Sequence, residues 1–314
     1  MQAVRFARFG GPEVLEVVEV PRPSPRRGEA LVRVRAAALN PKDTFVRKGR
    51  FRWLSGRPPL ATGFDFAGDV AALGPSTEGC GLELEQPVYG MLDGFRGGAC
   101  AEYVVAPAAT LAPMPSRLAY DEAAAVPLVT STALQALRDR GGWQPGQKVC
   151  INGASGGVGS MAVQLARLQG LSVTAISSAA RREFLTELGA ERVVDYARVD
   201  ITASDERFDL FFDVFGNRPF AAVKPILTER GVWISTVLRF HVVRSLAATV
   251  FGRGKRARLI VVRPSGQDLR QIGQWIDAGK LRPIVSQRFD LSEIAAAHAE
   301  LESKHTCGKL VLRI

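Results

Sequence analysis

Gly153-Ala-Ser-Gly-Gly-Val-Gly159 is the stretch that decides the fold of this 314-residue chain. An apolar run, residues 147–152, precedes it, and residues 158–169 follow with helical spacing. Glycine lets the backbone turn sharply and approach a pyrophosphate, while the amide groups at a helix start point at the phosphate. A strand, a glycine-rich loop and a helix in this order predict a dinucleotide-binding turn, whereas a glycine-rich turn alone would be weak evidence. The expected contacts are Gly153, Ala154, Ser155, Gly156, Gly157 and Val158.

The residues after the next predicted strand, 172–176, indicate which dinucleotide binds. Sites for NAD usually place Asp or Glu there to hold the ribose 2′-hydroxyl. This chain has Ser177, Ser178 and Arg181 instead. Hydroxyl groups and a guanidinium suit a 2′-phosphate, and no carboxylate is present to repel it, so we expect NADPH as the cofactor. The alternative for Arg181 is a solvated first turn of a helix.

Outward from this stretch, the pattern of the chain differs on the two sides. Up to about Arg117, short strands alternate with turns, which indicates a β-rich domain. From Asp121 onward, strands and helices alternate, which predicts parallel βαβ units. Six strands of one sheet are expected, at 147–152, 172–176, 193–194, 208–214, 232–236 and 259–262.

Both ends of the chain read as strands, so we expect the C-terminal segment to complete the first domain. The predicted fold class is α/β, with a doubly wound parallel Rossmann sheet inserted in a β-rich domain. We expect residues 1–118 and 268–314 to form the β-rich domain and residues 119–267 to form the Rossmann domain.

The composition is that of a globular protein, with 46% apolar and 23% charged residues. No apolar stretch approaches the roughly 20 residues that a membrane-spanning helix needs, so no span is expected. The first six residues read as a strand and not as a signal sequence, from which we expect a cytoplasmic protein. Three histidines and widely spaced cysteines give no cluster with metal-ligand spacing, so no metal site is expected. The cysteines are Cys80, Cys100, Cys150 and Cys307.

The formal net charge is +10, and residues 230–267 contain no Asp or Glu. Such a basic surface suits nucleic acid, anionic lipid or a phosphorylated cofactor. No specific nucleic-acid partner is expected, because Phe240 and Phe251 are too sparse for a stacking platform. One hypothesis is that residues 239–258 form an amphipathic helix with weak membrane-surface contact. We favour a helix at a cleft mouth or in a dimer contact, followed by a solvated basic loop.

Several short motifs occur in one order along nearly the whole chain. They are Asn40-Pro-Lys-Asp43, Gly63-Phe-Asp-Phe-Ala-Gly68, the loop from Gly153, Leu188-Gly-Ala190, Val194-Asp-Tyr196, Asp277-Ala-Gly-Lys-Leu-Arg-Pro283 and Gly308-Lys-Leu-Val311. With them the chain resembles the zinc-independent medium-chain dehydrogenase/reductases, in particular the zeta-crystallin-like quinone oxidoreductases, including the reticulon-interacting mitochondrial reductases. The resemblance implies a GroES-like β-domain, completed by the C-terminal segment, with the Rossmann domain inserted in it. It also implies a homodimer.

The resemblance further implies that no zinc ion is bound. Zinc-dependent relatives carry a cysteine near the position of Asn40, a histidine at that of Phe64 and a four-cysteine lobe, all absent here. Without a Lewis acid, reduction of an activated, conjugated acceptor is expected rather than ionisation of an alcohol. Phe51 and Trp53 stand where many relatives have a tyrosine, so no phenol is available there as a proton donor. Cys100 replaces a common aromatic and is interpreted as a small buried hydrophobe.

Similar enzymes imply further contacts to the cofactor, around the adenosine 2′-phosphate and at the ends of later strands. The residues implied near the 2′-phosphate are Ser177, Arg181, Tyr196 and Lys304. Phe215 and Val237 would border the cofactor from the ends of later strands. For Tyr196 and Phe215, the alternative is an ordinary place in the core.

On the substrate side, the resemblance implies Asn40, Asp43 and Thr132 as site residues. Asn40 would donate a hydrogen bond to the negative charge that develops on the acceptor oxygen, with solvent supplying the proton. The alternatives are that Asn40 and Asp43 form a turn ahead of a helix, and that Thr132 caps or packs its own helix.

Together these features predict hydride transfer from C4 of NADPH to a quinone or an α,β-unsaturated carbonyl compound. The protein would hold donor and acceptor at reactive distance and exclude water. An enoyl-thioester reductase is the nearest alternative, and the missing tyrosine counts against it because that reaction needs a proton donor at the α-carbon. A cofactor-binding protein that associates with membranes or acts as a sensor is the alternative of a different class.

Overall fold

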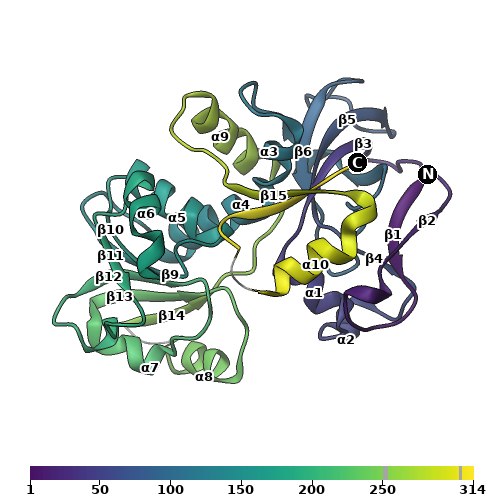
Figure 1. Ribbon diagram of the computed structural model, residues 1–314. Helices are drawn as coiled ribbons and strands as arrows, with labels where there is room; N and C mark the ends of the chain where they lie inside the picture. The colour runs from purple at the N-terminus through teal and green to yellow at the C-terminus, as the bar shows by residue number, and fades with distance from the viewer. Residues whose placement is uncertain (250–253, 304–305) are drawn as a thin grey trace. The chain divides into compact units, whose positions relative to one another are not determined.

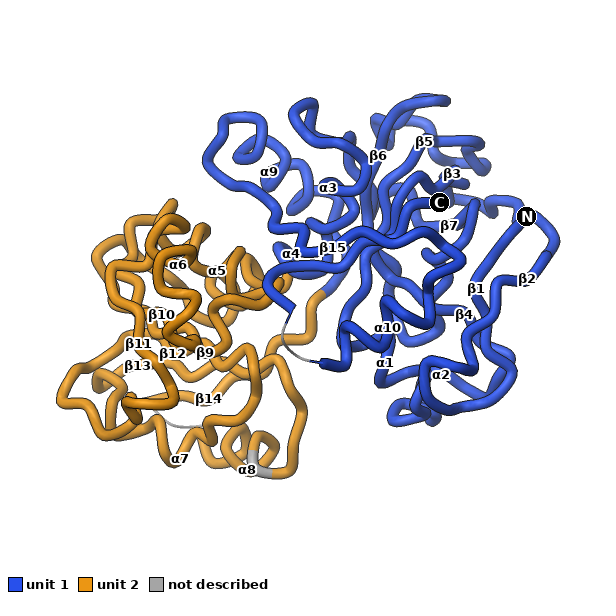
Figure 2. The backbone as a smooth tube through the Cα atoms, viewed as in Figure 1, with its two compact units in different colours: residues 1–131, 263–314 blue, residues 132–262 orange. Residues whose placement is uncertain are grey.

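The computed structural model describes residues 1–249, 254–303 and 306–314. The chain divides into two compact units, coloured separately in Figure 2: unit 1 contains residues 1–131 and 263–314, and unit 2 contains residues 132–262. The sequence predicted the first division at residue 118. Residues 119–131 group with unit 1 because α3 (Tyr120–Ala124) packs on β3 (Glu29–Ala38) and β5 (Asp65–Leu73) of that unit.

Unit 2 is built on a parallel sheet of six strands, which confirms the predicted fold class for this part of the chain. The strand order is β11-β10-β9-β12-β13-β14, so the first strand lies in the middle and the direction of growth reverses between β9 and β12. This is the Rossmann order, with its topological switch point at β9. The strands are β9 (Lys148–Asn152), β10 (Ser172–Ser177), β11 (Arg192–Asp195), β12 (Phe208–Asp213), β13 (Leu227–Ser235) and β14 (Arg256–Leu259).

The last of these strands differs from the prediction, which was residues 259–262. Arg256 and Arg258 flank the fully buried Ala257, so the strand follows an alternating pattern and not the apolar run. The apolar run leaves the sheet after Leu259, and Val261 is exposed.

Helices cover both faces of this sheet (Figure 1). On one face lie α5 (Gly157–Leu168) and α6 (Arg182–Leu188), and on the other lie α7 (Phe220–Val223) and α8 (Phe240–Thr249). Val242 of α8 belongs to the buried core around Trp233, and Leu246 packs against that core. Two apolar side chains of the segment 239–258, for which membrane contact was one hypothesis, are therefore directed inward. Residues 250–253 lie outside the described residues.

Unit 1 contains two sheets. The smaller has the order β2-β1-β4, and the larger has the order β15-β16-β3-β5-β6-β8, with β7 paired to β3. The C-terminal strand β16 lies antiparallel to β3, which confirms the expectation that the end of the chain completes the first domain. The remaining strands are β1 (Gln2–Phe6), β2 (Glu16–Glu19), β4 (Leu60–Ala61), β6 (Pro87–Met91), β7 (Tyr103–Pro107), β8 (Ala112–Pro113), β15 (Val285–Asp290) and β16 (Lys309–Arg313).

Helices close the edges of unit 1, and one of them crosses into unit 2. The Ala- and Leu-rich segment 122–138 does not form one continuous helix, because it contains the end of α3, then α4 (Pro127–Gln135), then a π-helical turn at Ala136–Gly141. Pro127 suits the first turn of a new helix but lacks the N–H group that a continuing helix needs. The other helices of unit 1 are α1 (Pro41–Arg47), α2 (Arg52–Ser55), α9 (Gly266–Asp277) and α10 (Ile294–Ser303). In the described part of the chain, no helix is both long and apolar enough to cross a membrane.

Candidate active site

The glycine-rich loop connects β9 to α5 at the carboxyl end of the sheet in unit 2. Gly153 has a positive φ of 83°, which favours glycine, and its N–H donates to the Ile176 carbonyl oxygen at 3.3 Å. The helix α5 begins at Gly157, one residue before the predicted start. The amide groups of a first helical turn have no partner inside the helix, so α5 presents donors and the positive end of its dipole at the loop. This arrangement binds an anion.

Gly159 lets the helix lie against the loop. A Cβ atom at this position would stand 2.1 Å from the Gly153 carbonyl oxygen and 2.6 Å from the Ala154 Cα, both of them backbone atoms. At Gly156 the situation differs, because the nearest atom to an added Cβ would be 3.6 Å away. The loop is thus packed tightly at Gly159 and open at Gly156, which fits the close approach of a pyrophosphate.

Ser177 ends β10 and joins the loop to the neighbouring strand end. Its hydroxyl donates to the Ser155 Oγ at 2.9 Å, and its carbonyl oxygen accepts from the Tyr196 N–H at 3.2 Å. The structure therefore brings together three residues predicted to contact the cofactor. Tyr196 is 59% exposed, so it is not the core aromatic of the alternative interpretation.

Two arginines follow β10. Ser178 precedes a short 3-10 turn, Ala179–Arg181, and α6 begins at Arg182. Arg181 is half-buried and Arg182 is exposed, and within the described ranges neither side chain makes a hydrogen bond or an ion pair. Between Ser177 and Arg182 the chain has no Asp or Glu. Unpaired guanidinium groups beside this strand end suit an additional phosphate.

The next two strands bring Phe215 and Val237 to the same edge of the sheet. Phe215 follows β12 and is 54% exposed, and an added Cβ on Gly153 would lie 3.3 Å from the Phe215 Cβ. Val237 follows β13 and packs on Gly216, where an added Cβ would lie 2.5 Å from the Val237 Cγ2. Both residues follow the carboxyl ends of parallel strands, which is where open α/β sheets bind ligands.

A buried carboxylate that the sequence reasoning missed shapes the turn carrying Phe215. Asp213 ends β12, and its Oδ1 accepts from the Asn152 Nδ2 at 2.7 Å and from the Gly216 N–H at 2.9 Å. Its Oδ2 accepts from the Arg218 N–H at 3.0 Å. Burial raises the pKa of Asp213, while the hydrogen bond from Asn152 lowers it. Because Asn152 ends β9, this network ties the glycine-rich loop to the turn after β12.

Asn40 and Asp43 lie together at the start of α1 in unit 1. Asn40 precedes the first helical residue, and its backbone N–H donates to the Asp43 Oδ2 at 2.7 Å. The Asp43 Oδ1 accepts from the Gly63 N–H at 2.7 Å and from the Thr62 Oγ1 at 3.2 Å. The turn ahead of a helix is therefore present, and it also holds the segment 62–63 against α1.

Asp43 is fully buried, and this burial raises the pKa of its carboxyl group to about 6. The backbone N–H groups of Asn40 and Gly63 act in the opposite direction. Cys100 is buried nearby, and burial together with the charge of Asp43 raises the pKa of its thiol well above the ordinary value. Cys100 is therefore a buried, protonated thiol, as its sequence context predicted.

The Asn40 side chain belongs to a buried network with Asp65 and Lys309. The Lys309 Nζ donates to the Asn40 Oδ1 at 2.6 Å, to the Asp65 Oδ2 at 3.0 Å and to the Leu39 carbonyl oxygen at 2.8 Å. The Asn40 Nδ2 donates to the same Asp65 oxygen at 2.9 Å, and the other Asp65 oxygen accepts from the Leu128 N–H. Asn40 is only 1% exposed and both ends of its amide are engaged, so the geometry favours a positioning role over direct contact with an acceptor.

The residues predicted for the substrate side are divided between the two units. Thr132, in α4, is buried and belongs to unit 2, whereas Asn40 and Asp43 belong to unit 1. The predicted cofactor residues from Gly153 to Val237 all belong to unit 2. Lys304, also predicted near the cofactor, lies outside the described residues.

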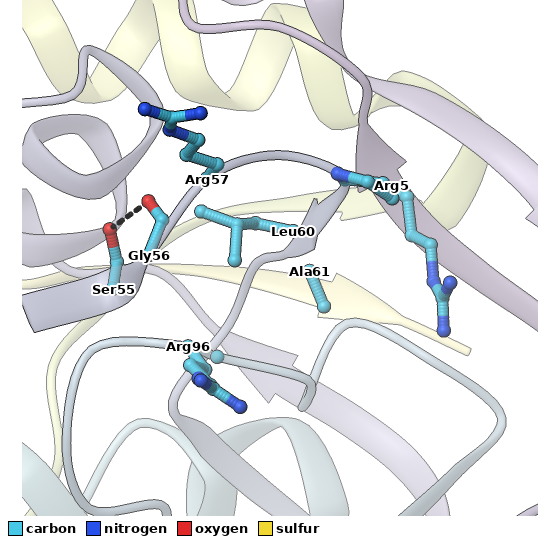
Figure 3. Close-up of a pocket in the computed structure, with 9 residues that line it drawn as sticks. Arg5, Ser55, Gly56, Arg57, Leu60, Ala61 and Arg96 are labelled. Atoms are coloured by element: carbon cyan, nitrogen blue, oxygen red, sulfur yellow. Dashed lines mark hydrogen bonds between the residues drawn. The ribbon is translucent and has the colours of Figure 1, made fainter. Parts of the chain in front are cut away.

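Unit 1 has a hollow of about 360 Å³ on the strand β4 that leads to Thr62 (Figure 3). Arg5, Arg57 and Arg96 line it around Leu60 and Ala61, and no carboxylate is among its lining residues. As far as the chain is described, these three guanidinium groups have no hydrogen bond or ion pair. Three unpaired cations around one hollow suit an anionic group.

Metal-ligating side chains do not gather in the part of the chain that the structure describes. No three His, Cys, Asp or Glu residues there are arranged so that they could hold a metal ion. Phe64, at the position where the zinc-dependent relatives have a histidine, is fully buried in an apolar core.

Comparisons with known proteins agree with this geometry. Two family models match, an alcohol dehydrogenase GroES-like domain over residues 26–116 and a zinc-binding dehydrogenase over residues 188–312. The chloroplast envelope quinone oxidoreductase homolog of Arabidopsis thaliana is 30% identical over 324 aligned residues, which cover 99% of this chain and 98% of that protein. The chain belongs to the zeta-crystallin-like quinone oxidoreductases. This family is part of the medium-chain dehydrogenase/reductases.

Other members of this wider family carry different names. The NADPH-dependent alkenal/one oxidoreductase of Arabidopsis thaliana is 31% identical, covering 99% of this chain and 79% of that protein. A trans-enoyl reductase of Aspergillus terreus is 31% identical, covering 91% of this chain and 86% of that protein. The solved quinone oxidoreductase of Coxiella burnetii superposes with a TM-score of 0.92 at 32% identity, covering 100% of this chain and 99% of that one. The fold is therefore that of the quinone oxidoreductases over its whole length.

Four residues of this oxidoreductase site were not predicted, namely Asn152, Asp213, Asp65 and Lys309. Each is a polar residue within or at the end of an otherwise apolar strand, as in Lys309-Leu-Val-Leu and Phe-Asp65-Phe-Ala. A charged residue in such a run has to find a buried partner, and that requirement is the signal that identifies it. The identity of the partner is not readable from the sequence, because Asp65 and Lys309 are 244 positions apart.

Proposed function

We propose that this member of the family transfers a hydride from NADPH to a quinone or an α,β-unsaturated carbonyl compound. One observation carries the proposal: beside a loop with room for a pyrophosphate, Ser177 is followed by the unpaired Arg181 and by no carboxylate. The names of relatives, quinone oxidoreductase and NADPH-dependent alkenal/one oxidoreductase, support the same pair of acceptor classes.

The residues present fit NADPH at the carboxyl edge of the unit 2 sheet. The amide groups at the start of α5, with Ser155, would bind the pyrophosphate, and Ser177, Arg181 and Tyr196 would bind the 2′-phosphate. Phe215 and Val237 would border the cofactor with apolar surface. When bound, the nicotinamide supplies the hydride.

In unit 1, the buried network holds the start of α1 in place. Lys309 and Asp65 fix the Asn40 amide, and Asp43 fixes the backbone at Gly63. Phe64, next in the chain, is fully buried and anchors this segment in the apolar core. A conjugated acceptor has an empty orbital of low energy and accepts a hydride without activation by a Lewis acid. We therefore propose that the reaction proceeds without zinc.

The test is an acceptor panel with the purified protein. NADPH and NADH oxidation is followed with 1,4-benzoquinone, 3-penten-2-one and trans-2-hexenal, before and after treatment with a strong chelator. We expect turnover of a quinone or an enone, preference for NADPH, and no loss after chelation. Tight binding of NADPH without turnover of any acceptor would overturn the proposal in favour of a sensor, and loss of turnover on chelation would overturn the zinc-independent mechanism.

A second candidate is an enoyl-thioester reductase, favoured by the hollow lined by Arg5, Arg57 and Arg96. An acyl group carried on a phosphorylated thiol would have anions for these cations to bind. Crotonyl-CoA and the phosphate-free crotonyl thioester of N-acetylcysteamine distinguish the two candidates. The second candidate predicts a lower KM for the CoA ester, and Arg96→Ala would remove that difference. Equal KM values would exclude it.

We further propose a cytoplasmic homodimer in which the basic segment around α8 is solvated. The inward direction of Val242 and Leu246 supports this over membrane binding. Light scattering gives the mass of the particle, and co-sedimentation with anionic vesicles at low salt tests the membrane hypothesis. Binding to vesicles that disappears with added salt would favour the membrane hypothesis.

A further inference from the structure

Lys42 is the second residue of α1 and lies between Asn40 and Asp43 in the sequence. Its Nζ stands 4.0 Å from the ring centroid of Phe64 and 4.8 Å from that of Phe95. The side chain is half-buried. An ammonium group over two aromatic faces is attracted by their quadrupoles, and this attraction fixes its position.

The ammonium of Lys42 has no hydrogen-bond acceptor or ion pair within the described ranges. The three acids that face it are Asp43, Asp65 and Asp93. The Asp43 oxygens accept hydrogen bonds from Asn40, Thr62 and Gly63. The Asp65 oxygens accept from Asn40, Leu128 and Lys309. One Asp93 oxygen accepts from the Gly94 N–H. Three N–H donors of a partly desolvated cation are thus left to bind something else.

The wall around this cation is aromatic. The Phe95 ring packs on Phe51 with centroids 4.7 Å apart, and Phe51 packs on Phe45 with centroids 6.2 Å apart. An apolar wall with one polar group suits a flat conjugated carbonyl compound, whose ring or chain packs on the aromatics while its oxygen accepts a hydrogen bond. Burial lowers the pKa of Lys42, and the neighbouring acids oppose this effect.

We propose that the Lys42 ammonium donates a hydrogen bond, and then a proton, to the oxygen of the acceptor. The inference rests on the function proposed above. As an enone receives hydride at its β-carbon, the C=C electrons move to the α-carbon and the C=O electrons to oxygen. The Lys42 N–H bond breaks, an O–H bond forms, and the enol so produced becomes the ketone in solvent. NADPH is oxidised to NADP⁺, the enone is reduced, and Lys42 regains its proton from water.

This role supplies the proton donor that no tyrosine provides in this chain. A positive charge at the acceptor oxygen stabilises the negative charge that develops there, and it does so most where water is excluded. Lysine suits the task because burial lowers its pKa, which makes its proton easier to release. Asn40, Asp65 and Lys309 then act as positioning residues for the turn that carries Lys42.

The experiment compares Lys42→Met, Lys42→Arg and the exposed control Lys280→Met with the wild-type enzyme. NADPH dissociation constants, kcat and KM are measured with 3-penten-2-one and with 1,4-benzoquinone. We expect Lys42→Met to lower kcat with the enone about 10²- to 10⁴-fold, with an unchanged NADPH dissociation constant. Lys42→Arg should keep KM and still lose kcat, since guanidinium holds its proton at neutral pH. The quinone should lose less, because it needs less help from an acid.

The pH profile separates proton donation from a structural role. In the wild type, kcat should fall as the pH rises through the lowered pKa of Lys42, and this alkaline limb should be absent in Lys42→Met. The pKa of Asp43 is about 6, so its protonation affects the acid limb of the profile and not the alkaline limb that is compared. If Lys42→Met is poorly folded, the same profile is read from Lys42→Arg, which keeps the cation over Phe64 and Phe95.

Equal kcat values for the Lys42 variants and the wild type, with the alkaline limb unchanged, would overturn the inference while leaving the proposed function intact. Absence of turnover by the wild-type enzyme with every acceptor would overturn the function itself. A loss of kcat accompanied by an equal loss of NADPH affinity would also contradict the role of Lys42, because a proton donor acts after the cofactor is bound.

Discussion

Replacing Lys309 by Met tests whether the buried network of unit 1 depends on its cation. The Lys309 side chain is 5% exposed and that of Asp65 is 0% exposed. Methionine keeps the length of the side chain but removes the three hydrogen bonds of the ammonium to Asp65, Asn40 and the Leu39 carbonyl. The Asp65 carboxylate would keep only the donors from Asn40 and Leu128 and would lose its counter-charge.

Removing one partner of a buried ion pair costs about 3–5 kcal/mol, because the other charge stays in an environment of low polarity. For a unit of this size, each kcal/mol lowers Tm by about 2–4 °C, so we expect unit 1 to melt about 6–20 °C lower.

Differential scanning calorimetry measures the change in melting temperature, and Lys48→Met is the matched control. Lys48 is more exposed and pairs with Glu302 at the surface, so its replacement should cost less than about 1 kcal/mol. The double variant Asp65→Asn/Lys309→Met, which removes both charges, should recover part of the loss. Equal shifts for Lys309→Met and Lys48→Met would refute the reasoning, as would a double variant that is no more stable than Lys309→Met.

Three further predictions concern the cofactor loop and the buried acid. Gly159→Ala should abolish NADPH binding detectable by calorimetry and lower the free energy of unfolding by about 1–3 kcal/mol, because the new Cβ would lie 2.1 Å from a backbone oxygen of the loop. The control Gly156→Ala should leave the free energy of unfolding unchanged. Arg181→Ala should weaken NADPH by about 10- to 150-fold and leave NADH unchanged, with Arg182→Ala as the control; equal weakening of both cofactors would contradict a phosphate contact. Since burial raises the pKa of Asp43 to about 6, unit 1 should lose about 3 kcal/mol as the pH rises from 4 through 6 in urea titrations, and Asp43→Asn should flatten this slope.

The fold was readable from the sequence wherever a local pattern determines a local structure. The loop from Gly153 and the alternation of strands and helices after Asp121 predicted the Rossmann unit, and the strand expected at the end of the chain is present as Lys309–Arg313. The predicted limits of helices and strands were wrong where two sequence patterns overlapped. Pro127 divides a continuous helical pattern, and at β14 the apolar run after Arg258 outweighed the true alternation.

The candidate site was readable only in part, because its polar contacts join distant segments. The proximity of Ser155, Ser177 and Tyr196 follows from adjacent parallel strands, which end at the same edge of the sheet. The pairing of Asn40 with Lys309 depends on β16 lying beside β3, a contact across the whole length of the chain. For the same reason Asn40 was predicted as a direct donor to the acceptor, while its buried amide favours a positioning role.

The strand β16 lies between β15 and β3, and this order has a consequence for biosynthesis. Unit 2 is one uninterrupted segment, residues 132–262, so it can reach its native state while the ribosome is still translating. Unit 1 has to wait, because its large sheet lacks an inner strand until Lys309–Arg313 emerge. Until then the Asp65 carboxylate lacks its ion-pair partner Lys309. We therefore expect chaperones to be needed most by the nascent chain in which residues 1–131 have been synthesised but Lys309–Arg313 have not.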